Sequence, residues 1–180
     1  MVEVARDLVG CVLRHGETAG VIVETEAYHE TEPACHAYIG LTRRTATLFG
    51  APGTAYVYRS YGIHALLNAV CEPEGVGAAV LIRALEPVDG IELMRARRGL
   101  HDERRLCSGP GKLTVALGID LDHNQSSLLD GPIAICRRPA AWREVEVVAD
   151  RRIGITKAPE LPWRFTAAGN RYVSRPAVLG

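Results

Sequence analysis

The chain has 180 residues, 47% of them hydrophobic, and a mean hydropathy of +0.02, values typical of a folded globular protein with a sizeable core. Its 21 basic and 21 acidic residues cancel, which excludes a strong overall field, so any surface for a polyanion must be local. Nineteen of the basic residues are arginine, a side chain suited to bidentate contacts with phosphate, although compositional drift explains the same bias.

The cysteines and the N-terminal segment bear on the cellular location. Five cysteines are widely spaced, without a Cys-x-x-Cys pair, which favours reduced thiols in a cytoplasmic protein over a disulfide framework or a zinc site. Glu3, Arg6 and Asp7 interrupt the first apolar residues, and no apolar run approaches about 18 residues, so we expect neither a signal peptide nor a membrane span. Because the chain begins within an amphipathic turn, we expect a few residues to precede it in the natural protein.

Short β-type runs dominate the chain, separated by Gly, Pro and charged turns. The predicted strands cover residues 11–15, 19–28, 54–59, 64–71, 77–87, 131–138, 151–156 and 163–167. Apolar spacing predicts helices at residues 88–98 and 111–117, the second preceded by Pro110, a favourable start signal. The polar segment 120–130 is expected to be an exposed loop. We therefore predict a single α+β domain over residues 1–180, with a mostly antiparallel sheet flanked by α-helices.

Three motif-like segments fail on inspection. A calcium loop is excluded in residues 120–131, because Gln125 and Gly131 stand where Gly and Glu are required. The segment CSGPGKL lacks the spacing of a phosphate loop, and His15 with Glu17 lacks the Pro-Cys-x-x-Cys of zinc deaminases. We therefore expect no metal and no cofactor.

The segment VIVETEAY is more informative. If residues 21–28 form a strand, alternation places Glu24, Glu26 and Tyr28 on one face. Such a face is either exposed at an edge of the sheet or the wall of a pocket, in which a carboxylate works beside an aromatic ring. Two carboxylates at this spacing also fit a sugar O-glycosidase that uses both Glu24 and Glu26.

Several motifs follow one another along the chain in a recognisable order. They are VETEAY (23–28), CHAY (35–38), GTAYVYRSYGIHALLN (53–68), VLIRALEP (80–87), LCSGPGKL (106–113) and PWRF (162–165). Together they resemble the alkyladenine, or 3-methyladenine, DNA glycosylase family over nearly the whole chain. The resemblance implies a curved sheet with a protruding β-hairpin, and an enzyme that excises alkylated or deaminated purines from double-stranded DNA without a metal, a cofactor or a lyase step.

The resemblance also implies a catalytic role for two residues. Glu26 would be the general base that deprotonates the attacking water, and Arg83 would help to hold that water. A cation beside Glu26 also favours its ionised form. Glu24 is then spare, because a cationic 3- or 7-alkylpurine leaves without a proton donor, and we expect Glu24→Gln to retain activity.

The same resemblance implies separate roles for tyrosines within residues 28–61 and for two of their neighbours. Tyr28, His36 and Tyr58 would sandwich a base flipped out of the duplex, and stacking offsets the cost of flipping. Asn68 would lie at the pocket floor and clash with the exocyclic amine of guanine. Tyr61, in the hairpin turn, would enter the minor groove and fill the gap. Tyr56 is given no contact with the base, and we expect it to serve packing.

The sequence offers several candidate residues for contacts with DNA phosphates. The candidates are Arg43, Arg44, Arg59 and Lys112, each of which is equally read as a solvated surface charge. The loop between Tyr28 and His36 is short, and residues 41–49 match the family loosely, so the range of lesions stays open. A non-catalytic binder of bent or damaged DNA remains a third possibility. The absence of a repeat or zipper favours a monomer.

Overall fold

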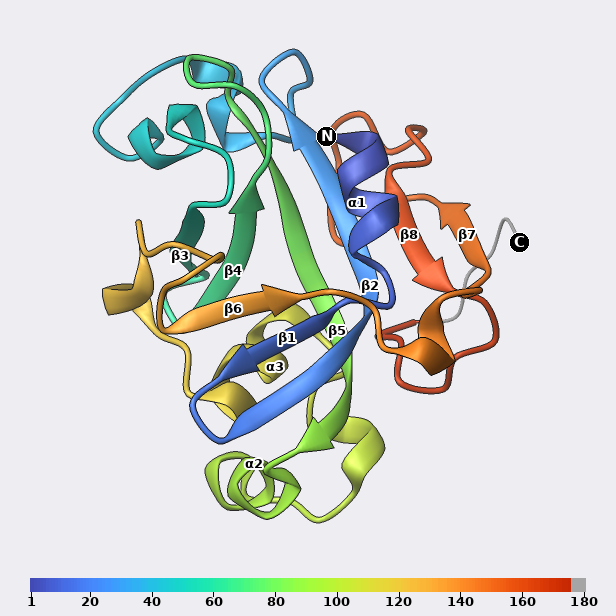
Figure 1. Cartoon of the computed structure of the whole chain (residues 1–180). Coiled ribbons are helices and arrows are strands. Elements are labelled where there is room, and N and C mark those ends of the chain that lie inside the picture. The colour runs from blue at the N-terminus through green and yellow to red at the C-terminus, as the bar shows by residue number, and fades with distance from the viewer. Residues whose placement is uncertain (176–180) are drawn as a thin grey trace.

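The computed structural model describes residues 1–175, and its main feature is an antiparallel sheet that curls into a half-barrel (Figure 1). All strand pairs are antiparallel. The sheet runs in the order β3 (Ala55–Ser60), β4 (His64–Val70), β5 (Ala78–Asp89), β2 (Thr18–His29), β1 (Val12–His15) and β6 (Ile133–Cys136). A further strand, β8 (Arg164–Ala167), pairs with β2 and with β7 (Val147–Asp150). The α+β class predicted from the sequence is confirmed.

Three short helices flank the sheet. They are α1 (Val2–Leu8), α2 (Ile91–Arg98) and α3 (Pro110–Leu117). The 3-10 turns are η1 (His36–Ile39), η2 (Ala46–Phe49), η3 (Glu103–Arg105), η4 (Leu121–His123) and η5 (Ala140–Trp142). Helix α3 begins at Pro110, where the missing N–H costs nothing. In residues 1–175 no helix has the length and apolarity needed to cross a membrane.

Two sequence predictions need correction. The predicted helix at residues 88–98 begins only at Ile91. Asp89 is still part of β5, where it pairs with Ala19 of β2, and Gly90 has a φ of 67°. The predicted strand at residues 151–156 is wrong, since the strand lies just before it, as β7. After Asp150 the chain leaves the sheet and turns toward β2, where its polar groups find partners.

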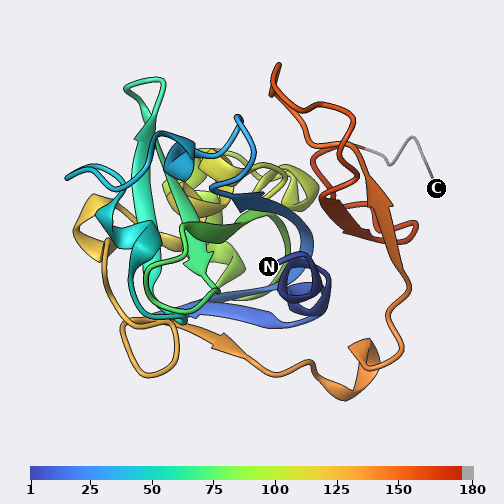
Figure 2. The same ribbon diagram turned by 90° about the horizontal axis from the view of Figure 1, so that it is seen from above.

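Three apolar clusters hold these layers together. One fills the space between the sheet and helices α2 and α3, and includes Leu13, Ile22 and Leu113. A second lies beneath α1 and β8 around Phe165, on the side of the half-barrel where Figure 2 shows the C-terminal strands β7 and β8. The third cluster, which includes Tyr56, packs under residues 35–49. The central strands β2 and β5 are therefore covered along most of their length.

Three irregularities interrupt the pairing of β2 with β5, and two of them control where polar side chains point. The register passes from Ile22 opposite Leu85 to Glu24 opposite Ala84, which leaves Val23 without a partner on β5. It then passes to Thr25 opposite Ile82, which leaves Arg83 without a partner on β2. Bulges of this kind re-aim side chains and occur beside active sites. Here they bring Arg83 to the two glutamates of β2.

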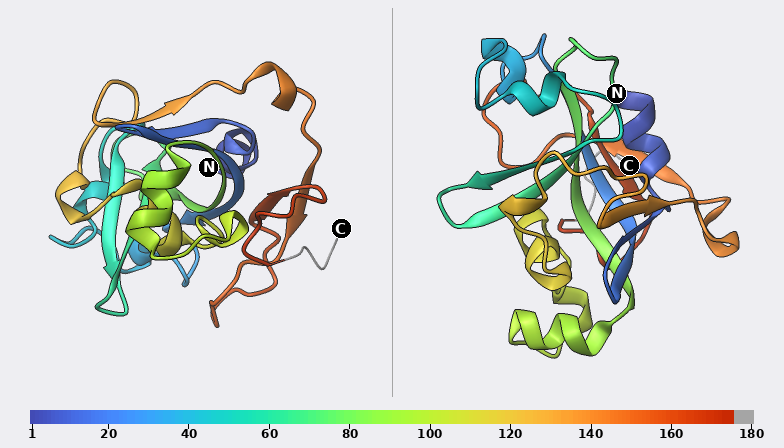
Figure 3. Two further views of the ribbon diagram at one scale, coloured as in Figure 1. Left: turned by 90° about the horizontal axis from the view of Figure 1, so that it is seen from below. Right: turned by 60° about the vertical axis from the view of Figure 1, so that its left-hand side comes forward.

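The hairpin between β3 and β4 projects beyond the sheet (Figure 3). Its turn places two consecutive residues at positive φ, Tyr61 at 49° and Gly62 at 71°, and the Ile63 amide donates to the Ser60 carbonyl at 3.1 Å. Positive φ at both central positions matches the twist of a tight hairpin but is unfavourable for a bulky residue such as Tyr. The Tyr61 side chain is 90% exposed, so packing does not explain the strained conformation.

Replacing Tyr61 with Gly should leave the free energy of unfolding unchanged or raise it by up to about 1 kcal/mol. Glycine adopts positive φ without a steric penalty, and the exposed ring has few contacts to lose. Urea unfolding of the variant and wild type measures the difference. A fall of more than about 1 kcal/mol would show that the ring stabilises the hairpin.

Candidate active site

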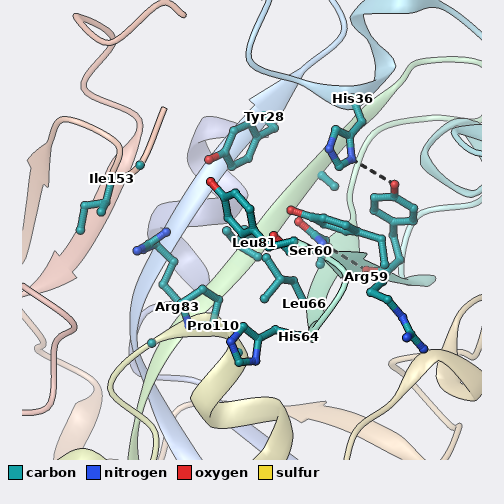
Figure 4. Close-up of a pocket in the computed structure, with 18 of the residues that line it drawn as sticks. Tyr28, His36, Arg59, Ser60, His64, Leu66, Leu81, Arg83, Pro110 and Ile153 are labelled. Atoms are coloured by element: carbon teal, nitrogen blue, oxygen red, sulfur yellow. Dashed lines mark hydrogen bonds between the residues drawn. The ribbon is translucent and has the colours of Figure 1, made fainter. Parts of the chain in front are cut away.

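A cavity of about 640 Å³ opens beside the hairpin (Figure 4). Aromatic and apolar side chains from β2, β3, β4 and β5 form its walls, together with the N-terminal turn of α3 and residues 153–155. The residues that bear on its chemistry are Tyr28, His36, Arg44, Tyr56, Tyr58, Arg59, His64, Asn68, Arg83, Arg98, Lys112 and Ile153. The volume and lining suit a planar organic group.

Glu26 lies behind one wall of this cavity and is fully buried. The Tyr28 hydroxyl donates to its Oε2 at 2.8 Å, and Arg83 Nη1 donates to the same oxygen at 3.1 Å. The Ile153 amide donates to Oε1 at 2.6 Å. The three donors line the cavity themselves, so the carboxylate lies one side chain behind its surface. Of the two alternatives that the sequence left open for this face, the exposed edge is excluded, because Glu24 and Glu26 are fully buried on a strand inside the sheet.

Glu24, also fully buried, is held from several directions. Its Oε1 accepts from Arg83 Nε at 3.1 Å and from Arg164 Nε at 2.8 Å. The Ser174 hydroxyl donates to Oε1 at 2.8 Å, and the Ser174 amide donates to Oε2 at 2.6 Å. Arg164 also bonds Asp150 at 3.1 Å. Glu24 thus holds the Nε end of the Arg83 guanidinium, while Arg83 Nη1 reaches Glu26.

Competing effects set the protonation of Glu26. Burial raises the pKa of the Glu26 carboxyl above its ordinary 4.5, while the Arg83 charge and the bonds from Ile153 and Tyr28 act in the opposite direction. Burial, and then the Glu26 charge, raise the pKa of Tyr28 well above 10.0. Tyr28 therefore stays protonated and remains a donor to the carboxylate. A base with a raised pKa accepts a proton more readily when a reaction demands it.

Aromatic rings gather on the opposite wall. The rings of His36 and Tyr58 meet edge to face with centroids 4.6 Å apart, and Tyr56 stacks on Tyr58 at 5.3 Å. A hydrogen bond of 3.1 Å joins His36 Nδ1 and the Tyr56 hydroxyl, so Tyr56 does more than pack. Burial, and then the Arg44 charge, lower the pKa of His36 below 6.5. At neutral pH this wall carries no charge on its rings.

Asn68 and the basic residues take different positions. Asn68 is 5% exposed, lines the cavity, and donates from Nδ2 to the Tyr56 carbonyl at 3.1 Å. Arg44, Arg59 and Lys112 are exposed residues of the lining. Arg43 is exposed and is not part of that lining.

Tyr61 completes the group of predicted residues. It lies on the rim of the cavity, at the hairpin tip. The structure therefore brings Tyr28, His36, Tyr58 and Asn68 to one cavity with Arg83 and the wedge candidate.

Sequence reasoning missed four contributors to the site. Ile153 contributes a backbone N–H, which carries no residue signature. Arg152 and Glu32 form a buried ion pair beside Tyr28, and Arg98 lines the cavity from α2. The motif PWRF pointed to the neighbourhood of Arg164, but its partner Glu24 is 140 residues away in sequence. Nothing local could have revealed that contact.

The fold and the site define the class of protein: an α+β domain in which a buried, hydrogen-bonded carboxylate lies behind an aromatic cavity with room for a planar group. Comparison with known sequences supplies the particular family. The family model of methylpurine-DNA glycosylases (MPG) matches residues 1–171. The chain belongs to this family and is a DNA glycosylase for alkylated bases, with DNA as its partner.

Curated relatives agree in name. A protein of Rhodopseudomonas palustris (strain BisB18), named "Putative 3-methyladenine DNA glycosylase", is 58% identical over 174 residues, which cover 97% of this chain and 86% of the relative. A protein of Methanoculleus marisnigri with the same name is 55% identical over 180 residues, covering 97% of this chain and 93% of the relative. The similarity therefore covers most of each chain in the proteins of both organisms.

Arg83→Gln should lower the free energy of unfolding by about 3–5 kcal/mol at pH 8, because it leaves Glu24 and Glu26 buried without this cation. The variant also loses an influence that lowers the pKa of Glu26. Its folded state then binds a proton at a higher pH than wild type does, so protonation relieves the buried charge and the deficit should shrink toward pH 5.5. Urea unfolding at both pH values measures this change.

Arg104→Gln, at an exposed position, is the control for loss of an arginine. The double variant Glu26→Gln/Arg83→Gln should recover part of the lost stability at pH 8, since one buried charge is removed with its counter-ion. An equal deficit at both pH values would contradict the assignment of Arg83 to Glu26.

Proposed function

We propose that this protein flips damaged purines out of double-stranded DNA and hydrolyses their N-glycosidic bond with a water activated by Glu26. The observation that carries the proposal is the position of the Glu26 carboxylate, held by Tyr28, Arg83 and Ile153 directly behind an aromatic cavity. Hydrolysis of a base requires the nucleotide to leave the stack. A cavity of about 640 Å³ has room for a purine.

The hydrogen bonds of Glu26 leave a place for the attacking water. An ionised carboxylate has about four acceptor sites on its two oxygens. Oε2 accepts from both Tyr28 and Arg83, whereas within residues 1–175 Oε1 accepts from the Ile153 amide. We infer that water approaches Oε1, that Glu26 takes its proton as oxygen attacks the sugar carbon, and that the carboxylate stabilises the oxocarbenium-like transition state. Arg83, next to Glu26 on the cavity wall, helps to hold this water.

The wall of neutral rings suits a cationic leaving group. Tyr28, His36 and Tyr58 would stack on the flipped base, and stacking contributes about 1–3 kcal/mol per base with a further cation–π gain for a charged purine. His36 is neutral because its pKa is lowered, so it does not repel a cation. We infer excision of 3-methyladenine and 7-methylguanine without a proton donor, and also of hypoxanthine and ethenoadenine.

The reaction is proposed to stop at the abasic site. A lyase step needs an amine that forms a Schiff base with the sugar. The chain has two lysines, Lys112 and Lys157, and the Lys112 ammonium donates to the Ser108 carbonyl at 3.1 Å. We therefore infer a monofunctional glycosylase.

The sugar O-glycosidase alternative meets an obstacle in Glu24. Both of its oxygens accept hydrogen bonds, from Arg83, Arg164 and Ser174. Two of these three partners, Arg164 and Ser174, lie outside the cavity lining, so Glu24 is occupied by groups that do not face a leaving group in the cavity. It therefore does not fit the role of general acid.

We propose that Tyr61 acts as the wedge. Its ring is exposed at the hairpin tip on the rim of the cavity, and an apolar wedge inserted from the minor groove fills the gap left by a flipped base. Arg44, Arg59 and Lys112 around the cavity would contact phosphates. We propose that the protein acts as a monomer in the cytoplasm.

Glu26→Gln should reduce excision by about 10²- to 10⁴-fold, because the amide cannot accept the proton of the water. Duplexes that contain 7-methylguanine, 3-methyladenine, hypoxanthine or ethenoadenine are incubated with the enzyme, and abasic sites are then cleaved with alkali. Wild type should give strand breaks only after alkali, and the variant almost none.

Two matched variants complete this test. Glu74→Gln, at an exposed position, should match wild type, and Glu24→Gln should lose stability but retain excision. Loss of turnover in Glu24→Gln to the level of Glu26→Gln would favour the two-carboxylate mechanism. A wild-type protein that binds these duplexes without excising any base would be a damage binder instead.

Asn68→Ser should raise excision of 7-methylguanine relative to hypoxanthine by about tenfold, because a smaller side chain at the cavity wall relieves the expected clash with the guanine amine. Single-turnover rates on both duplexes give the ratio. Asn170→Ser, which lies outside the cavity lining, is the control. An unchanged ratio would remove Asn68 from the account of specificity.

A further inference from the structure

A buried ion pair connects two loops at the back of the active site. Arg152 Nη1 and Nη2 donate to Glu32 Oε1 and Oε2 at 2.7 and 3.0 Å. Arg152 is 5% exposed and Glu32 is 4% exposed. A bidentate pair of this kind fixes the orientation of both planar groups. It joins the loop that follows β2 to the segment that follows β7.

The Arg152 guanidinium also supports the aromatic wall. Its carbon lies 4.7 Å from the centroid of the Tyr28 ring and 5.3 Å from that of Trp163. Arg152 donates further to the Ala27 carbonyl at 3.0 Å and to the Ala158 carbonyl at 3.3 Å. Ala27 is the residue between Glu26 and Tyr28. Arg152 is thus bonded to the strand at the point where it carries the candidate base and its aromatic neighbour.

The residue after Arg152 completes the connection. The Ile153 amide donates to Glu26 Oε1 at 2.6 Å, and Figure 4 shows Ile153 beside Tyr28 and Arg83 at the same side of the cavity. Residues 151–163 form no helix or strand, so regular backbone pairing does not hold this amide in place. The residue before it, Arg152, is instead held through its side chain, by Glu32, Ala27 and Ala158.

We propose that Arg152 and Glu32 are positioning residues for base excision: their ion pair sets the plane of the Tyr28 ring and holds the Ile153 amide on the Glu26 carboxylate. The inference rests on the proposed function of this site. Neither side chain is required to touch the purine or the water. Their effect passes through Tyr28 and Glu26, where a small displacement of a catalytic group has a large effect on rate.

Loss of the Arg152–Glu32 pair should change how the rate of excision depends on pH. The Ile153 hydrogen bond lowers the pKa of Glu26, so loss of that bond should raise it and move the acidic limb of the rate profile to higher pH. The other charged and titratable groups near Glu26 stay in place in the variants. They are Glu24 and Tyr28 on β2, Arg83 on β5, Asp150 on β7 and Arg164 on β8.

Single-turnover excision of 7-methylguanine from a duplex is measured between pH 5.5 and 8.5 for Arg152→Gln, Glu32→Gln and the double variant. Each single variant should lower the plateau rate by about tenfold and shift the acidic limb upward by about half a pH unit. The double variant should be no slower than Arg152→Gln, because both residues act through one pair. Arg152→Lys, which keeps the charge without the fork, should lie between wild type and Arg152→Gln.

Arg151→Gln, at the exposed neighbouring position, should retain the wild-type rate and profile. A folded Arg152→Gln with an unchanged rate, or with a lower rate and an unmoved acidic limb, would overturn the proposal. If Arg152→Gln does not fold, Glu32→Gln decides by the same two criteria. Carboxyl-labelled glutamate NMR follows the pKa of Glu26 without any substrate. A wild type without excision would therefore refute the proposed function, while the NMR titration still tests the link from Arg152 to Glu26.

Discussion

The structure depends on one arrangement of charge, in which Arg83 bridges the fully buried carboxylates of Glu24 and Glu26. Two like charges away from water repel each other and lose their hydration, so they persist only with a cation and hydrogen-bond donors around them. Arg83, on β5, can reach both carboxylates because a register shift leaves it opposite no residue of β2 in the strand pairing. Strand β8 supplies Arg164, and the chain end supplies Ser174. Elements far apart in the sequence must therefore assemble before the carboxylates are stabilised, which ties the formation of the site to the completion of the fold.

This arrangement gives the two glutamates different properties although they lie two residues apart. Glu24 is held by two arginines and both donors of Ser174, and neither Arg164 nor Ser174 belongs to the cavity lining. Glu26 shares one arginine, has a raised pKa, and is separated from the cavity by the groups that bond it. A base with a raised pKa accepts a proton more readily. The network of Glu24 thus supports the proposed role of Glu26 by keeping Arg83 in place rather than by taking part in proton transfer.

Local patterns predicted most of the fold. Short β-type runs bounded by turn residues gave β1 to β6 and β8, and Pro110 gave the start of α3. The strand expected at residues 151–156 failed because its alternating Ile residues mimic a strand, whereas Arg152 is drawn inward by Glu32. The bulge at Arg83 could not be predicted from the sequence either, because the register of a long strand pair is set by packing on both faces. Motif resemblance supplied Tyr28, His36, Tyr58 and Asn68, but it could not supply a backbone amide or an ion pair between distant loops.

The net charge of the chain stays close to zero even when the buried charges are set apart from the rest. Glu24, Glu26, Glu32 and Asp150 are buried with Arg83, Arg152 and Arg164, which leaves 17 acidic and 18 basic residues of the 21 of each, so an attraction for DNA must come from how the exposed charges are arranged. Exposed charges act locally because salt screens them within about 10 Å. Arg44, Arg59 and Lys112 lie together around the cavity, where a phosphate backbone would pass if Tyr61 entered the minor groove. In the proposed function, a few cations at the cavity rim, rather than an excess over the whole surface, would direct a duplex to this site.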